Sequence, residues 1–108
     1  MTPAAALRAL HAAGRLASPH LPGMCWITAD QRWRAYDPAG EPALDDPATA
    51  GGLFALLREA TPGTRWQVGD WGDRWLCEPI AGPYGIVHLG ATEGEAVAAA
   101  LIAIAGGA

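Results

Sequence analysis

The chain has 108 residues, of which 51% are apolar and 17% are charged, and its formal net charge is −4. A chain of this length can bury most of its unfolded surface in one core, so we predict a single α/β sandwich domain over residues 1–108. This composition excludes an intrinsically disordered chain, and the acidic charge argues against a general nucleic-acid binder, which would present a basic surface.

The sequence lacks the basic segment and continuous apolar run of a signal peptide, and it contains no apolar stretch long enough to cross a bilayer. We therefore expect a cytoplasmic protein. Its two cysteines, Cys25 and Cys77, do not have the spacing of a metal site, and in a reducing compartment we expect both to be buried thiols.

The first part of the chain predicts one helix and one hairpin. The helix is expected over residues 2–14, because Thr2-Pro3 suits a helix start and Gly14 is placed to end it. After a connector that contains two prolines, residues 24–28 and 32–36 have the composition of strands, and the polar residues between them predict a hairpin.

A second helix is predicted to begin at Asp46, which is a natural N-cap, with Pro47 at the first helical position. Apolar residues then repeat at helical spacing as far as Leu57, and Thr61-Pro62-Gly63 ends the helix. The pair Gly51-Gly52 costs about 1 kcal/mol per glycine relative to alanine. We expect close approach to another backbone to compensate for this cost.

The second half contains the clearest strand pattern. Residues 65–68 and 74–78 predict a hairpin whose apolar face, carrying Trp66 and Trp75, receives the helices. Residues 84–89 predict one more strand.

The closing helix is predicted from a capping box, in which Thr92 accepts from the third helical amide and Glu95 reaches back. One apolar stripe follows, made of Val97, Ala100, Leu101 and Ile104. The other positions from Ala96 to Ala105 are apolar as well, which is unusual for a surface helix. One hypothesis is therefore a homodimer in which this helix pairs across a two-fold axis.

Taken in order, the predicted elements are αββαβββα. We predict an α+β fold in which three helices pack on an antiparallel sheet of four or five strands.

Parts of the second half resemble the phage ABA sandwich domain, a family of small virus-encoded modules. The resemblance rests on the segment Asp46-Pro47-Ala48-Thr49-Ala50 through Leu57, the strands with Trp66 and Trp75-Leu76-Cys77, and the closing segment from Ala91 to Leu101. It implies an α/β sandwich of phage or prophage origin with no enzymatic site. Small phage proteins commonly bind host proteins, so the resemblance also implies an inhibitor of a host defence component, such as an anti-CRISPR protein that binds a CRISPR effector.

The chain has five tryptophans, and Trp71 differs from the others because glycine and aspartate flank it in a predicted turn. Exposed tryptophans are enriched at binding hot spots, and charged neighbours can form a polar rim around them. We predict a partner-binding site made of this turn and part of the first hairpin: Trp71, Asp70, Asp73, Arg74, Asp30, Arg32 and Arg34. The alternative for the two aspartates is that they only form the turn.

Other chemistry has little support in the sequence. The histidines and cysteines are dispersed without the spacing of a metal or catalytic motif, so we predict no catalytic residue, no metal and no cofactor. Nucleic-acid binding would depend on a local arginine cluster of Arg32, Arg34, Arg65 and Arg74, which the net charge disfavours. The alternatives that stay open are a phage structural or assembly protein, a homodimeric accessory protein, and a small enzyme or metal-binding domain.

Overall fold

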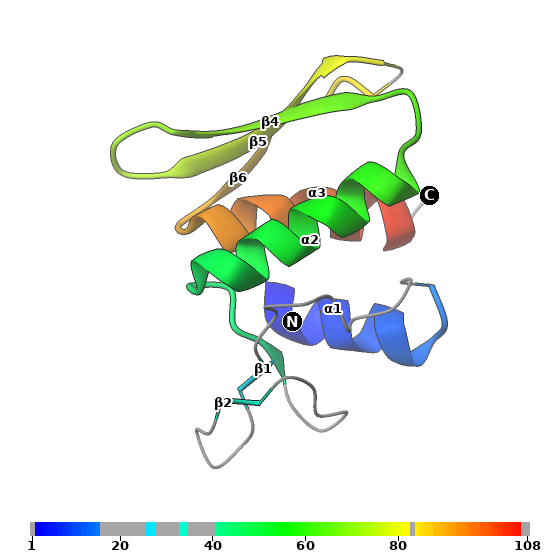
Figure 1. The fold of residues 1–108 in the computed structure, drawn as a ribbon, viewed down its shortest axis with the longest axis vertical. Helices are drawn as coiled ribbons and strands as arrows, with labels where there is room; N and C mark the ends of the chain where they lie inside the picture. Colours follow the sequence, from blue (N-terminus) through cyan, green and yellow to red (C-terminus); the bar gives the residue numbers. More distant parts are fainter. Residues whose placement is uncertain (1, 16–25, 28–32, 35–40, 83, 107–108) are drawn as a thin grey trace.

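The computed structural model describes residues 2–15, 26–27, 33–34, 41–82 and 84–106. Within these residues the elements follow the order α1 (Pro3–Ala12), β1 (Trp26–Ile27), β2 (Trp33–Arg34), β3 (Glu41–Pro42), α2 (Pro47–Ala60), β4 (Arg65–Asp70), β5 (Trp75–Ala81), β6 (His88–Gly90) and α3 (Glu93–Gly106). The fold is α+β with antiparallel strand pairing, as predicted (Figure 1).

The strands form two groups of three, in the orders β4-β5-β6 and β2-β1-β3. A single sheet of four or five strands is therefore not confirmed, and β3 adds a short strand between the first hairpin and α2 that was not predicted. Figure 1 gives the physical reason, because the helices lie between the long β4–β5 hairpin and the two-residue strands β1 and β2. The first hairpin cannot reach the edge of the larger sheet from there.

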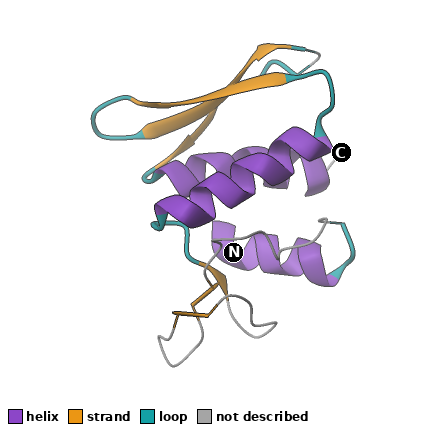
Figure 2. Cartoon of the chain, viewed as in Figure 1, coloured by secondary structure: helices purple, strands orange, loops and turns teal. Residues whose placement is uncertain are grey.

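Helix α3 lies in the middle of the fold. It contacts α1, α2 and all three strands of the β4–β6 sheet. The fold therefore has three layers, which are the β4–β6 sheet, the pair of helices α2 and α3, and helix α1 (Figure 2). Five of its residues are fully buried: Ala96, Val97, Ala98, Ala100 and Leu101. This position explains why the helix is apolar on nearly every side. The homodimer hypothesis needs the apolar surface of α3 to be free, but other parts of the same chain bury most of that surface.

All three helices begin at the predicted residues, Thr2, Asp46 and Thr92. The capping box of α3 is complete, because Thr92 Oγ1 accepts from the N–H of Glu95 at 3.1 Å and Glu95 Oε2 accepts from the N–H of Thr92 at 3.2 Å. The Thr92 hydroxyl also donates to the backbone C=O of Leu44 at 2.9 Å. This bond connects the start of α3 to the segment that leads into α2.

The side of the sheet that faces the helices forms one wall of the core. Trp66 and Cys77 are both buried on this side, in agreement with the prediction that the apolar face of the hairpin receives the helices. The indole N–H of Trp66 donates to Thr61 Oγ1 at 2.9 Å, and the Thr61 hydroxyl donates to the C=O of Leu57 at 2.7 Å. The polar atom of a large buried ring is thus paired, which fixes the orientation of the ring.

Two helical glycines occupy opposite environments. A Cβ built on Gly94 would overlap with the backbone carbonyl of Leu44, whereas no described atom lies within 4 Å of a Cβ built on Gly51. Close backbone approach was expected at the Gly51-Gly52 pair. For Gly51 that expectation is wrong, since the residue is exposed on α2.

This contrast gives a matched pair of substitutions. Gly94→Ala should lower the free energy of unfolding by about 1–3 kcal/mol or more, because the new methyl group has no space beside Leu44. Gly51→Ala should raise it by up to about 1 kcal/mol, because alanine favours an exposed helix position. Urea unfolding followed by tryptophan fluorescence measures both. Changes of the same sign and size would contradict the packing at Gly94.

Candidate partner-binding site

The predicted site turn lies at the free end of the β4–β5 hairpin (Figure 1). Residues 71–74 connect Asp70 and Trp75, which are the last paired residues of the two strands. The backbone N–H of Trp71 donates to the C=O of Arg74 at 2.8 Å. This bond continues the hairpin pairing into the turn and restricts the backbone on both sides of Trp71.

Asp70 and Gly72 give the turn its shape. Asp70 Oδ1 accepts from the backbone N–H of Gly72 at 2.8 Å. Gly72 has a φ of 82°, which residues with a side chain rarely adopt. Asp70 therefore does form the turn, and its role in the site is to hold the backbone of the turn in place.

The Trp71 side chain is 70% exposed at this tip. Asp73 and Arg74 are also exposed, with 3.6 Å between Arg74 Nε and Asp73 Oδ1. An ion pair this exposed adds little to stability, so a binding partner can rearrange it at small cost. A large apolar ring with charged groups around it is the arrangement expected of a contact residue.

The structure brings together the four turn residues of the predicted site: Asp70, Trp71, Asp73 and Arg74. Asp30 and Arg32 lie outside the described residues. The backbone of Arg34 pairs with Trp26 in β1–β2, on the other side of the helix layer from the hairpin tip (Figure 1). The tip and β2 therefore do not form one continuous site.

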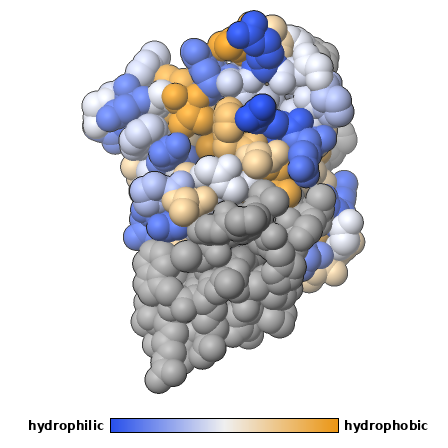
Figure 3. Space-filling view, in the orientation of Figure 1, coloured by the Kyte–Doolittle hydropathy of each residue, from blue (hydrophilic) through white to orange (hydrophobic). Residues whose placement is uncertain are grey.

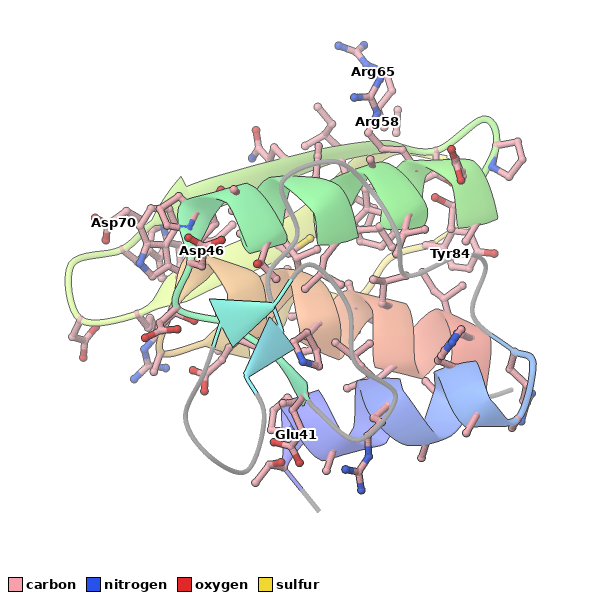
Figure 4. All side chains as sticks on the ribbon, turned by 60° about the horizontal axis from the view of Figure 1, so that its bottom comes forward. Glu41, Asp46, Arg58, Arg65, Asp70 and Tyr84 are labelled. Carbon is pink, nitrogen blue, oxygen red and sulfur yellow. The ribbon has the colours of Figure 1, made fainter. Side chains whose placement is uncertain are left out.

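Acidic residues gather near the turn end of the hairpin, beside Trp75, where α2 and α3 both begin. A hollow of about 220 Å³ lies there, lined in part by Asp45, Asp46, Glu93 and Trp75. Figure 4 shows Asp46 and Asp70 at the same end of the molecule. This gathering is not visible in the sequence, because acidic residues at helix starts are common and only the shared direction of α2 and α3 brings them to the hairpin.

Two of the arginines on which nucleic-acid binding would depend, Arg65 and Arg74, lie apart. Arg65 begins β4 and Arg74 lies in the turn at the other end of that strand, so the hairpin separates them. Figure 4 shows Arg65 and Arg58 of α2 projecting on the same side of the molecule, and the Arg58 guanidinium lies 6.0 Å from the Phe54 ring centroid. This placement gives no support to a continuous basic surface for nucleic acid.

A second exposed surface surrounds β6, which is shorter than the predicted strand because residues 84–87 have no regular structure. We define the β6 patch as five apolar side chains that are 41% to 69% exposed: Ile80, Tyr84, Ile86, Val87 and Leu89. Part of it borders a hollow of about 280 Å³ that Trp66, His88 and Ile104 help to line. The Trp66 ring centroid lies 6.2 Å from that of Tyr84 and 6.4 Å from that of His88.

Burial shifts the pKa values of two described side chains, Cys77 and His88. Cys77 is fully buried, and this burial, with a smaller contribution from the charge of Glu78, raises the pKa of its thiol to about 12. Burial lowers the pKa of His88, which favours the neutral form of its ring. Among the residues that the structure describes, no group of three or more His, Cys, Asp or Glu could hold a metal ion. His20 and Cys25 lie outside this part of the chain.

No family model, curated protein or solved structure matches the chain. The resemblance to the phage ABA sandwich domain therefore stays a prediction from the motifs. None of the helices within the described ranges has the length and apolar character needed to cross a membrane.

The Cys77 thiol predicts a pH dependence of stability. In the folded chain its pKa is about 12, against an ordinary value of 9.0, so above pH 9.0 the unfolded chain loses this proton first. The stabilisation is fully present below pH 9.0 and is lost progressively as the pH rises towards 12. Urea unfolding on both sides of pH 9.0 should show a steeper alkaline loss in the parent than in Cys77→Ala. An equal loss of stability in the parent and in Cys77→Ala as the pH rises would show that the thiol is not buried as described.

Proposed function

We propose that this chain is a protein-binding module that acts by contact rather than by catalysis, and that the hairpin tip is its main contact surface. Trp71 carries this proposal, because its ring is 70% exposed on a turn whose backbone is fixed by hydrogen bonds. An aromatic side chain on a rigid turn has little conformational freedom to lose when a partner covers it. Nothing in the core depends on that ring, so its exposure is better explained by binding than by folding.

The charges around the tip favour a partner surface with basic residues. Asp73 is 81% exposed, and Asp45 and Glu93 line the hollow beside Trp75, next to the turn. Arg74 is the single basic side chain in this described group, so the end of the molecule has an acidic excess. Opposite charges on a partner would speed the encounter and select its orientation.

For the biological role, we propose an inhibitor of a host defence protein, such as a CRISPR effector, that works in the host cytoplasm. The resemblance of the second half to the phage ABA sandwich domain supports this role. A contact surface without an associated catalytic group fits an inhibitor that blocks its target by occupying it.

Affinity capture tests the binding proposal. The parent protein and Trp71→Ala are immobilised and exposed to host lysate, and bound proteins are identified and then titrated in purified form. We expect Trp71→Ala to raise the dissociation constant by about 30-fold or more, as truncation of an interface hot spot does. Gln67→Ala, which also changes an exposed side chain of the same hairpin, should bind like the parent.

Two results would contradict the proposal. Equal affinity of the parent and a folded Trp71→Ala variant would show that the tip is not the contact surface. If the folded parent protein retains no specific protein from the lysate, the proposal that it binds a host protein is contradicted.

A further inference from the structure

The exposed apolar side chains of this protein gather in two places. In the part of the chain that the structure describes, Trp71 is the one large apolar side chain with high exposure outside the β6 patch. Figure 3 shows apolar surface over the upper part of the fold, next to more hydrophilic surface. Five such side chains within ten residues give an exposed area on the order of several hundred Å², which is typical of interaction sites.

The backbone beside the patch lacks a strand partner. The sheet order β4-β5-β6 makes β6 an edge strand, so its outer side faces no other described strand. Leu89 is paired with Leu76 of β5, and both lie on the face opposite the buried Cys77, because side chains alternate along a strand. An edge strand with apolar neighbours readily pairs with another strand.

Charge decides which partner suits this surface. Residues 79–92 contain no Asp, Glu, Lys or Arg, although the whole chain has a net charge of −4. A partner selected by opposite charge would gain nothing from an uncharged patch. Two copies of one acidic chain repel each other, and a neutral region is where they can approach with the least repulsion.

We propose that two copies of this chain associate through the β6 patch, with their β6 edges antiparallel across a two-fold axis. Antiparallel edges are related naturally by such an axis, and the same apolar residues then cover each other. The hollow beside Trp66, Tyr84 and Ile104 receives an apolar side chain of the second copy. Two facing patches bury on the order of 1,000 Å² in total, which is the lower range of specific interfaces.

This interface differs from the α3 pairing that the sequence suggested, and it does not depend on the hairpin tip. Tyr84 and Asp70 lie at opposite ends of the molecule in Figure 4. Leu89 pairs with β5 near the tip, but Trp71 is not part of the patch, so Trp71→Ala tests binding to a host protein separately from self-association.

Light scattering during size-exclusion chromatography, over a range of micromolar concentrations, tests the proposal. The parent should show the mass of two chains and dissociate on dilution. Ile86→Asp changes the most exposed side chain of the patch, and because the change enters the contact twice, the dimer dissociation constant should rise by at least about 30-fold. Ala9→Asp adds the same charge to an exposed position of α1 and should leave the dimer unchanged, as should Trp71→Ala.

A parent that has the mass of one chain at every concentration would overturn the proposal, and this result does not depend on how any variant folds. A dimer that persists unchanged in Ile86→Asp, with its circular dichroism intact, would move the interface elsewhere and also overturn it. Capture of a host protein that Ile86→Asp loses, by a parent that is itself monomeric, would assign the patch to that partner instead.

Discussion

The burial of α3 is the constraint on which the rest of the structure depends. This helix contacts the other two helices and the β4–β6 sheet, so its side chains must fit against three neighbours at once. Small residues make that possible, since Ala96, Ala98 and Ala100 are fully buried and Gly94 lies against the Leu44 carbonyl. A larger side chain at these positions would force the layers apart. The capping box and the bond from Thr92 to Leu44 fix where this central helix starts.

The position of α3 also determines which surfaces are left for binding. One face of the sheet is occupied by helix, and the hairpin tip and the β6 edge remain towards solvent. The thiol of Cys77 is enclosed on the helix side, where burial keeps it protonated. Among the described residues, the exposed surfaces therefore include an indole on a fixed turn and an uncharged apolar edge.

Local features could be predicted from the sequence and tertiary ones could not. The helix starts at Asp46 and Thr92 and the turn at Trp71 were predicted correctly, because each depends on residues only a few positions apart. The separation of the strands into two groups depends on where the helices pass between them, which no local pattern records. The apolar surface of α3 was visible in the sequence, but periodicity alone does not distinguish a helix inside the fold from one that pairs with a second chain. Alternation along residues 84–89 likewise predicts two strand faces without showing that one is left uncovered.

Native-state hydrogen exchange, resolved for single amides by NMR, tests the central role of α3 most directly. If α3 is the common packing element, its buried amides near Val97 and Leu101 exchange only when the whole chain unfolds, with a protection free energy equal to the global one. The amides of the hairpin tip around Trp71 should exchange through smaller openings. Exchange of the α3 amides through local opening, while β4 and β5 stay protected, would contradict this account.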